Sequence, residues 1–376
     1  MMSSNYLPFT RPTLDDETIA GVADVLRSGW ITSGPMVEKF EKGLTEYLGG
    51  KRYLRSYLHA TGALEEALVM AGIGPGDEVI VPAMTFAASA NVVLRVGAKP
   101  VLVDVDIKSR SILMDQAAAA VTPRTRAIMP VHLNGLAVDL DAVYALAKKH
   151  GLRVIEDAAQ AIGTEYKGKR IGSFGDIVVF SFHANKNLTT IEGGAVSVAT
   201  LEEAKRLEVL RFHGITKFPD GTMDVTEAAS KHNMTDVAAR VGIGQLARLD
   251  EFNAKRRALA HRYLELLGDE ELAVVPAKGD AGHSWHMFTP LPHYKKYSLD
   301  RTTLKQRMHE RGIGLGIHYQ ALNQFSLYQD MGYREGQFPN AERIGSETLT
   351  FPLFPTMQMS DVDRVCEALR ACLKGS

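Results

Sequence analysis

Short hydrophobic runs rich in Val and Ile alternate with stretches of helical periodicity through roughly the first half of the chain. In one such stretch Leu64, Ala67, Leu68 and Ala71 recur at the spacing of a single helix face. Buried strands separated by helices indicate a mostly parallel sheet with helices on both faces, and ligands of such sheets bind at the carboxyl ends of the strands. We predict strands at residues 53–58, 78–81, 101–105, 127–131, 152–157, 177–182 and 194–199.

The order of elements changes in the second half of the chain. A helix is predicted between Asp139, its N-cap, and Gly151, which lies beyond its end. A long helical pattern then runs over residues 233–268 and leads out of the parallel region. This change predicts a large domain at residues 1–245 and a smaller α+β domain at residues 246–376. In the smaller domain we expect strands at 286–291 and 312–319 and helices at 301–312 and 361–374.

Composition excludes several classes of protein. The chain has 376 residues, 45% of them hydrophobic, and its 43 Lys and Arg nearly balance 44 Asp and Glu. This content excludes a disordered chain, and a net charge of −1 argues against a protein that neutralises nucleic acid or anionic lipid. The N-terminal residues show no signal-peptide pattern, and no hydrophobic run approaches the roughly 18 residues of a membrane span. We expect a cytoplasmic protein with a small ligand and no contact with nucleic acid or membrane.

The metal-binding residue types are sparse or scattered. The only cysteines are Cys366 and Cys372, and the 12 histidines have no recognisable metal-ligand spacing. We expect neither a disulfide framework nor a metal site.

Two glycine-rich segments differ in what they can bind. Residues 72–76 follow a helix and precede a strand, so they form a turn rather than a phosphate loop. Residues 59–62 follow a strand and open a helix, where small residues and the Thr61 hydroxyl could meet an anion. An ordinary helix with Thr61 as its N-cap is the alternative.

Residues 154–195 place a carboxyl side chain and an amine side chain at the ends of successive predicted strands. Asp157 ends one buried strand, and Lys186 follows the next. Taken alone, Lys186 is better explained as a solvated loop lysine. A pyridoxal phosphate enzyme needs a lysine amine, a carboxylate against the pyridine nitrogen, a helix N-terminus for the phosphate and an aromatic face for the ring. Each has a candidate, with Ser181 beside the helix start and Phe86, otherwise a core aromatic, as the ring face.

The chain resembles the DegT/DnrJ/EryC1/StrS family of sugar aminotransferases over nearly its whole length. The most specific motif is His-x-x-Lys-Asn-x-Thr-Thr-x-Glu-Gly-Gly, which begins at His183, and further matching segments lie at residues 7–41, 72–86, 156–195, 311–322 and 349–355. The family consists of fold-type I, pyridoxal-phosphate-dependent enzymes. The resemblance implies a mostly parallel seven-stranded sheet in the large domain, helices on both its faces and the smaller α+β domain at the C-terminus.

The resemblance also implies roles for individual residues. Lys186 matches the Schiff-base lysine and Asp157 the partner of the pyridine nitrogen. The other matches are Gln160 near the ring hydroxyl, Phe86 as the stacking aromatic, Thr61 and Ser181 with the Ala60 backbone as phosphate ligands, and His318 and Tyr319 with His183 at the sugar substrate. The usual phosphate motif is Ser-Gly-Thr, whereas this chain has His59-Ala60-Thr61, so the role of His59 stays open.

The family builds its site in a homodimer with shared active sites, where a segment of one subunit reaches the phosphate pocket of the other. The corresponding segment here is 231–236, with Lys231 and Asn233 as the cofactor-binding candidates. Its Lys-x-Asn pattern is similar to the subgroup that aminates UDP-4-keto-pentose for lipid A modification. The resemblance therefore implies transfer of an amino group from glutamate, which becomes 2-oxoglutarate, to the 4-keto carbon of a nucleotide-linked ketosugar for lipid A or surface polysaccharide.

Three alternatives stay open. A C3-aminotransferase or a perosamine-type C4-aminotransferase would use the same scaffold. A sugar 3-dehydratase of this family has histidine in place of the lysine, and Lys186 argues against it. A non-catalytic nucleotide-sugar-binding regulator would tolerate loss of Lys186.

Overall fold

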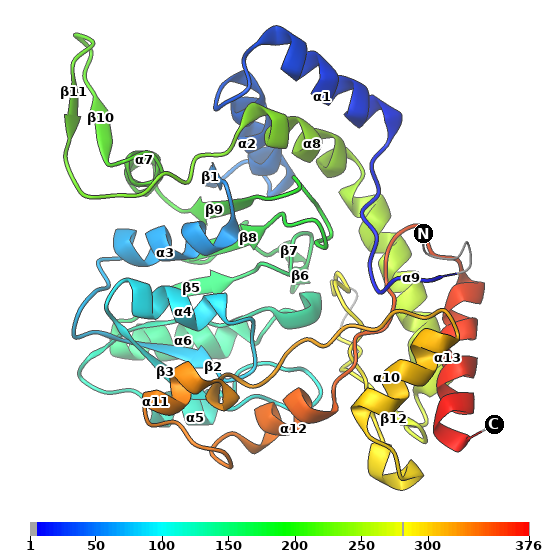
Figure 1. Ribbon diagram of the computed structural model, residues 1–376. Coiled ribbons are helices and arrows are strands. Elements are labelled where there is room, and N and C mark those ends of the chain that lie inside the picture. Colours follow the sequence, from blue (N-terminus) through cyan, green and yellow to red (C-terminus); the bar gives the residue numbers. More distant parts are fainter. Residues whose placement is uncertain (1–5, 280–281, 376) are drawn as a thin grey trace.

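The computed structural model describes residues 6–279 and 282–375, and its centre is a seven-stranded sheet (Figure 1). Strand β9 is antiparallel to both of its neighbours, whereas the pairs from β8 to β3 are all parallel. The predicted α/β fold with a mostly parallel sheet is therefore confirmed. In spatial order the strands are β1 (Tyr53–Tyr57), β9 (Gly194–Val198), β8 (Ile177–Ser181), β5 (Arg153–Asp157), β4 (Thr125–Ile128), β2 (Glu78–Pro82) and β3 (Lys99–Val103).

Two predicted strands end earlier than their hydrophobic runs. The runs at 101–105 and 127–131 predicted strands to Val105 and Val131, but β3 ends at Val103 and β4 at Ile128. Residues beyond these ends are still buried, and both Val105 and Val131 form isolated bridges. Hydrophobicity reports burial rather than strand pairing, so the runs extend into the buried loops at the carboxyl edge.

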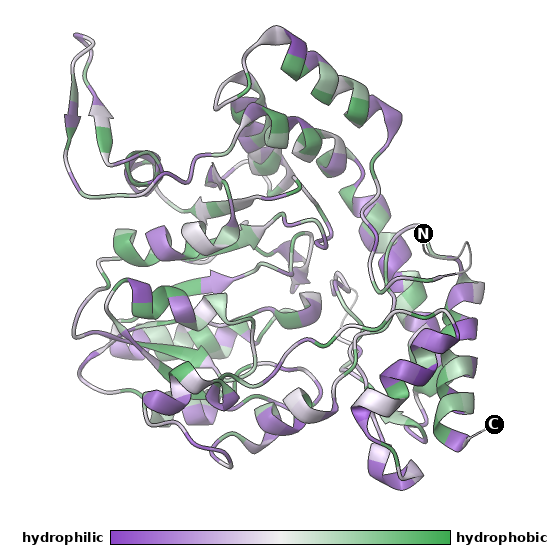
Figure 2. Cartoon of the chain, in the orientation of Figure 1, coloured by the Kyte–Doolittle hydropathy of each residue, from purple (hydrophilic) through white to green (hydrophobic). Residues whose placement is uncertain are grey.

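Helices cover both faces of the sheet, as predicted. Successive strand residues alternate between two hydrophobic clusters: Val79 and Val81 belong to one, and Ile80 to the other. Figure 2 shows the hydrophobic residues concentrated on these strands and on one side of the helices. The helices of this region are α1 (Asp16–Ser28), α2 (Pro35–Tyr47), α3 (Ala60–Met70), α4 (Ala88–Arg95), α5 (Met114–Ala119), α6 (Leu140–His150) and α7 (Leu201–Leu210).

The ends of α6 are those that the sequence predicts. The Asp139 side chain accepts a hydrogen bond from the N–H of Ala142, and Gly151 has the left-handed conformation at φ 67° that closes the helix. The long helical pattern at 233–268 is instead two helices, α8 (Asp236–Ala247) and α9 (Leu249–Leu267). They meet at Arg248, which has φ −113° and ψ 3°.

The C-terminal part has a hydrophobic cluster of its own. It joins α9, α10 (Arg301–Glu310) and α13 (Met359–Lys374), beside the short pair β12 (Ala273–Val274) and β13 (Leu291–Pro292). The strands expected at 286–291 and 312–319 are wrong in extent. Only Leu291 of these residues lies in a strand, and Phe288, Ile313 and Gly316 form isolated bridges, as between Gly316 and Thr350.

Helices α11 (Ser326–Asp330) and α12 (Pro339–Glu347) return to the large sheet. Tyr328 and Ile344 belong to the cluster of β2 and α3, not to that of α13. The predicted boundary between residues 245 and 246 falls inside α8, and the division into domains stays a prediction.

One hairpin projects from the body of the molecule. Strands β10 (Ile215–Lys217) and β11 (Met223–Val225) form it beyond α7 (Figure 1). Its hydrophobic side chains Phe218, Met223 and Val225 are exposed. A second small hairpin pairs β6 (Glu165–Tyr166) with β7 (Lys169–Arg170). Over the described ranges, no helix combines the length and hydrophobicity needed to cross a membrane.

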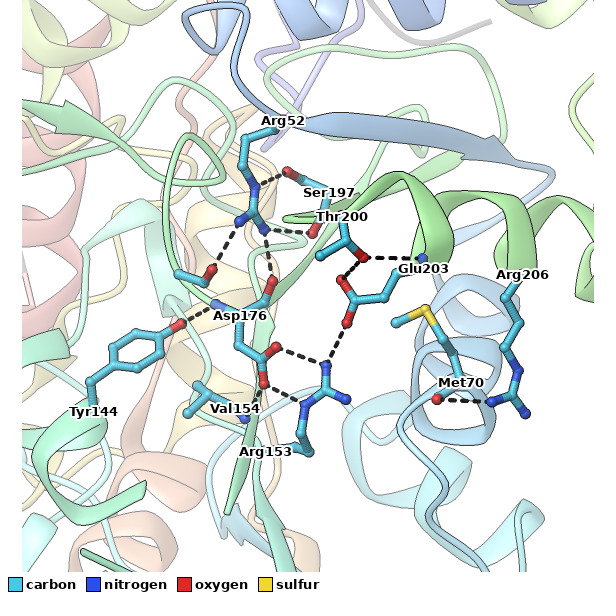
Figure 3. Close-up of polar contacts among 11 residues, drawn as sticks. Arg52, Met70, Tyr144, Arg153, Val154, Asp176, Ser197, Thr200, Glu203 and Arg206 are labelled. Carbon is cyan, nitrogen blue, oxygen red and sulfur yellow. Dashed lines mark hydrogen bonds and ion pairs between the residues drawn. The ribbon is translucent and has the colours of Figure 1, made fainter. Parts of the chain in front are cut away.

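Polar side chains join the amino ends of β1, β5 and β8 in a network, which we call the amino-end network (Figure 3). Its members are Arg52, Tyr144, Arg153, Asp176, Ser197 and Glu203. Tyr144 also connects it to Glu156 and His132, which lie nearer the carboxyl ends of the strands. The Arg52 guanidinium donates to the Ser197 hydroxyl and to the carbonyl of Asp176, whose carboxylate pairs with Arg153 at 2.8 Å. The network therefore ties three strands together.

Candidate active site

A cavity of about 350 Å³ lies at the opposite, carboxyl ends of the strands. It lies where the parallel sheet predicts a ligand site, and its volume is within the usual range for small-molecule sites. Every predicted site residue lines it except Lys231 and Asn233. The lining residues predicted from the sequence are Ala60, Thr61, Phe86, Asp157, Gln160, Ser181, His183, Lys186, His318 and Tyr319.

The start of α3 forms one wall of the cavity. The N-cap is His59, whose Nδ1 accepts a hydrogen bond from the N–H of Gly62 at 2.9 Å. The alternative in which Thr61 caps the helix is therefore wrong, and Thr61 is the second residue of the helix. The N–H groups of Ala60 and Thr61 lie in the first turn, where a helix offers them no acceptor. Together with the helix dipole they favour an anion at this wall.

Strand β9 brings a glycine against this helix start. A Cβ atom at Gly194 would lie 2.7 Å from the nitrogen of Ala60, closer than real contacts allow. The neighbouring strand ends at Ser181, which is paired with Gly194 and lines the cavity. The glycine thus lets the sheet and the first turn of α3 approach each other around one site.

Asp157 ends β5 and is 5% exposed. Its Oδ2 accepts a hydrogen bond from the Ser89 hydroxyl at 2.7 Å, and its Oδ1 accepts one from the N–H of Ala159 at 3.0 Å. These two contacts fix the orientation of the carboxyl group. Sequence reasoning missed Ser89, which lies in α4 and meets Asp157 only through the packing of α4 on the sheet.

Lys186 lies in the loop after β8 and is half-buried at the cavity. Burial lowers the pKa of its amine to about 8, while the charge of Asp157 acts in the opposite direction. The side chain is therefore not the freely solvated loop lysine of the alternative explanation. A buried amine of lowered pKa beside a carboxylate is typical of a catalytic lysine.

The residue after Lys186 anchors its loop. The side-chain amide of Asn187 donates to Oδ1 of Asn253 at 2.8 Å and to the carbonyl of Ser284 at 3.0 Å. The oxygen of the same amide lies 3.1 Å from Nδ1 of His286. These contacts join the loop to α9 and the segment after it. Sequence reasoning missed the anchors because all of them lie more than sixty positions away along the chain.

Phe86 lies on a wall of the cavity and is 56% exposed. It is therefore not a core aromatic, which was the alternative. Its ring lies 5.5 Å from that of Tyr319, and the Tyr319 hydroxyl accepts a hydrogen bond from the Gln160 side chain at 2.9 Å. The other end of that side chain accepts the N–H of Asn134 at 2.7 Å, which fixes Gln160 in place. Burial raises the pKa of Tyr319, so its hydroxyl stays protonated.

The two predicted histidines differ in environment. Nδ1 of His318 lies 2.6 Å from the Thr350 hydroxyl, and burial together with the charge of Lys186 lowers the pKa of His318 to about 4. His318 is therefore neutral at physiological pH. His183 is exposed at the cavity mouth, 3.7 Å from Glu192.

Lys231 and Asn233 lie outside this cavity. The Lys231 amine donates to Oδ1 of Asn233 at 2.9 Å, and the Asn233 amide donates to the Ser33 hydroxyl at 2.6 Å. Lys231 is exposed. Their role at the site of a second subunit stays a prediction.

The cavity residues fit pyridoxal phosphate. Lys186 supplies an amine of lowered pKa, Asp157 a carboxyl group fixed by hydrogen bonds and Phe86 an exposed aromatic face. The start of α3 with the hydroxyls of Thr61 and Ser181 supplies donors for a phosphate. No group of three or more potential metal ligands occurs within residues 6–279 and 282–375.

The sequence matches a known family along most of its length. The sequence profile described as the DegT/DnrJ/EryC1/StrS aminotransferase family matches residues 12–370. The chain is 39% identical over 387 aligned positions to the spore coat polysaccharide biosynthesis protein SpsC of Bacillus subtilis (strain 168), with 99% of this chain and 98% of that protein covered.

Solved structures agree with this match. The putative sugar aminotransferase Spr1654 of Streptococcus pneumoniae in its PLP form is 31% identical with a TM-score of 0.92, covering 98% of this chain and 99% of that one. A PMP form of the same protein has the same TM-score. Helicobacter pylori PseC, an aminotransferase involved in the biosynthesis of pseudoaminic acid, is 27% identical with a TM-score of 0.92, covering 99% of this chain and 100% of that one.

Proposed function

We propose a specific reaction on the premise that the chain belongs to the DegT/DnrJ/EryC1/StrS aminotransferase family and is a pyridoxal-phosphate-dependent sugar aminotransferase. The reaction moves an amino group from glutamate to the 4-keto carbon of a nucleotide-linked ketosugar and leaves 2-oxoglutarate. The observation that carries the proposal is the meeting of Lys186 and Asp157 at one cavity with the start of α3. A non-catalytic regulator has no need for a buried amine of lowered pKa.

Lys186 and Asp157 have different roles in the proposed reaction. When bound, pyridoxal phosphate supplies an aldehyde that captures an amine and a ring that takes up electrons. The Lys186 amine acts as general base and acid, because a pKa of about 8 leaves both of its forms populated near neutral pH. Asp157, whose carboxyl group is fixed by hydrogen bonds from Ser89 and Ala159, would hold the ring nitrogen and keep it protonated.

The remaining residues orient the two ligands. We assign the cofactor phosphate to Ala60, Thr61 and Ser181, the ring face to Phe86 and the ring hydroxyl to Gln160. The hydrogen bond from Gln160 to Tyr319 links that cofactor ligand to a predicted sugar contact. His318 and His183 complete the sugar side of the cavity.

For the substrate we propose a UDP-4-keto-pentose, used in the synthesis of lipid A or of a surface polysaccharide. The Lys-x-Asn pattern at residues 231–233 supports the pentose. The name of SpsC, a spore coat polysaccharide biosynthesis protein, supports a polysaccharide product and does not bear on lipid A.

For the assembly we propose a homodimer in which residues 231–236 of each subunit complete the partner's phosphate pocket. The exposed Lys231 carries the positive charge this requires, and exposed hydrophobic side chains lie nearby along the chain at Phe212 and Phe218. The cytoplasmic location expected from the sequence stays a prediction.

The test is a product assay with a small panel of nucleotide ketosugars. Purified enzyme with pyridoxal phosphate and glutamate is given UDP-4-keto-pentose and 3-keto and 4-keto hexose nucleotides. We expect amination at C4 of the pentose, identified by mass and by NMR. The matched control is Lys186→Ala, which should form no product. Preferential amination at C3, or of a 4-keto hexose, would replace the proposed substrate, and amination of none would contradict the proposed reaction.

A further inference from the structure

His59 is the N-cap of α3 and also lines the cavity. Histidine is not among the side chains that commonly cap helices. Its ring has two nitrogens, and the cap uses only one of them, because Nδ1 accepts the N–H of Gly62 at 2.9 Å. Ser or Asn would cap the helix equally well with one side-chain oxygen. Capping alone therefore does not explain why a residue with a second ring nitrogen occupies this position.

The capping contact fixes the tautomer of the ring. An Nδ1 atom that accepts a hydrogen bond has no proton, so the proton of the neutral ring is on Nε2. Within residues 6–279 and 282–375, this Nε2–H has no hydrogen-bond acceptor. The ring therefore carries one unused donor, at the helix start where the N–H groups of Ala60 and Thr61 are also free.

The ring is held in this orientation by a neighbour. The His232 ring packs edge-on against that of His59 at 5.2 Å, and a Cβ atom at Gly62 would lie 2.8 Å from the His232 ring. The backbone of His232 is itself fixed, because its carbonyl accepts the N–H of Leu58 and its N–H donates to the carbonyl of Arg211. Gly62 thus makes room for the side chain that positions His59.

We propose that His59 is a phosphate ligand of the cofactor, which donates from Nε2 while Nδ1 caps the helix. The Thr61 and Ser181 hydroxyls and the first N–H groups of α3 supply the other donors. The inference rests on the assignment of pyridoxal phosphate and does not depend on which sugar is aminated.

His59→Asn separates the two functions of the ring. The Asn side-chain oxygen can replace Nδ1 as the cap acceptor, but no atom replaces Nε2. His59→Ala removes both functions. The matched control is His150→Asn, an exposed histidine at the end of α6.

Two measurements on cofactor-free protein test whether His59 binds the phosphate. In equilibrium titrations followed by protein fluorescence, His59→Asn should weaken pyridoxal phosphate about tenfold, the usual size of a lost hydrogen bond to a charged group. It should change the affinity for pyridoxal, which has no phosphate, less than twofold. In thermal unfolding without ligand, only His59→Ala should lose a few degrees, because it alone lacks the cap.

Each outcome bears on the inference. Equal affinity of His59→Asn and wild type for pyridoxal phosphate would overturn it and leave His59 as a cap only. An equal loss of pyridoxal affinity would also overturn it, since the effect would then not involve the phosphate. If wild type binds no pyridoxal phosphate, the cofactor assignment fails as well, so the two failures can be told apart.

Discussion

Glu156 and Asp157 are adjacent on β5, yet their side chains join two different regions, the amino-end network and the cavity. Glu156 is linked to the amino-end network through Tyr144, whose hydroxyl donates to it at 2.6 Å and accepts the N–H of Asp176. It also accepts a hydrogen bond from Nε2 of His132 at 2.9 Å. Asp157 faces the cavity, with Ser89 and Ala159 on one side and the Lys186 charge nearby. Because successive side chains of a strand point to opposite faces, the carboxyl group of Glu156 has a structural role and that of the next residue, Asp157, lies at the cavity.

The two regions differ in how completely their polar groups are paired. In the amino-end network Arg52 donates to three carbonyls and a hydroxyl, and Arg153 pairs with both Asp176 and Glu203 (Figure 3). At the cavity, the Nε2–H of His59 has no hydrogen-bond acceptor in the described part of the chain, and the Phe86 side chain is 56% exposed although its ring contacts Tyr319. Polar groups whose hydrogen bonds are all made within the protein stabilise the fold. Polar groups left without a partner beside a cavity indicate that a ligand binds there.

Removal of the cavity amine should have the largest effect on activity. Lys186→Ala should lower transaminase activity by about 10³-fold or more, since it removes both the nucleophile and the proton carrier. The visible absorbance that appears when wild type takes up pyridoxal phosphate should be lost. The exposed Lys169 gives a matched control, and activity retained by Lys186→Ala would contradict the assignment.

The two adjacent carboxyl groups of β5 should respond differently to substitution. Asp157→Asn should lower kcat about 10²-fold by removing the charge opposite the cofactor ring, and should change the free energy of unfolding by less than about 1 kcal/mol. Glu156→Gln should do the reverse: it leaves a buried donor unpaired, which costs about 2 kcal/mol in urea denaturation, and kcat should be retained. Equal effects of both substitutions on kcat would remove the distinction between the regions.

Glu66 is a buried carboxyl group that lies away from the cavity and has no hydrogen bond within residues 6–279 and 282–375. It is 4% exposed, neither oxygen has a hydrogen-bond partner in the described part of the chain, and burial raises its pKa to about 8. Between pH 4.5 and 8 the folded protein then holds a proton that the unfolded chain has released. The free energy of unfolding should therefore fall as pH rises through this range. The melting temperature should fall with it by a few degrees.

Glu66→Gln is the control for this effect. The glutamine does not titrate, so the difference in melting temperature between the variant and wild type should grow from pH 5 to pH 8. The neighbouring His232, with Nε2 3.9 Å from Glu66, is present in both proteins. A difference that stays constant with pH would show that Glu66 is not protonated in the fold.

Lys186 should give a smaller pH effect of opposite sign. Its pKa is lowered to about 8 in the folded protein, so between pH 8 and 10.5 the unfolded chain binds the extra proton. The unfolding free energy of cofactor-free wild type should rise over this range relative to Lys186→Met. Parallel melting curves for the two proteins would indicate that burial does not shift the amine.

Local signals made part of the fold predictable. Asp139 and Gly151 mark the ends of α6 through contacts within four residues, so the sequence is sufficient there. The break at Arg248 has no such signal, because the pattern around it is continuous. The strand ends after Val103 and Ile128 were overestimated for a related reason, since the loops beyond them are buried like strands.

The candidate site, too, could be predicted only in part from the sequence. The sheet order alone predicts that Asp157 and the loop of Lys186 meet at one edge, whereas most other site residues were predicted from the family resemblance. Ser89, Asn187 and Asn253 were missed because their contacts depend on how α4 and α9 pack. His59 could not be assigned a role in advance, because its capping contact requires the ring orientation seen in the structure.

The return of residues 321–344 to the large sheet limits how the protein can be cut. Tyr328, Phe338, Ala341 and Ile344 complete the hydrophobic cluster of β2 and α3, although α9 and α10 precede them along the chain. A fragment that stops at residue 245 would leave that part of its core open to water. The large sheet is thus assembled from two separate stretches of sequence, and synthesis of the chain must pass residue 344 before this core can close.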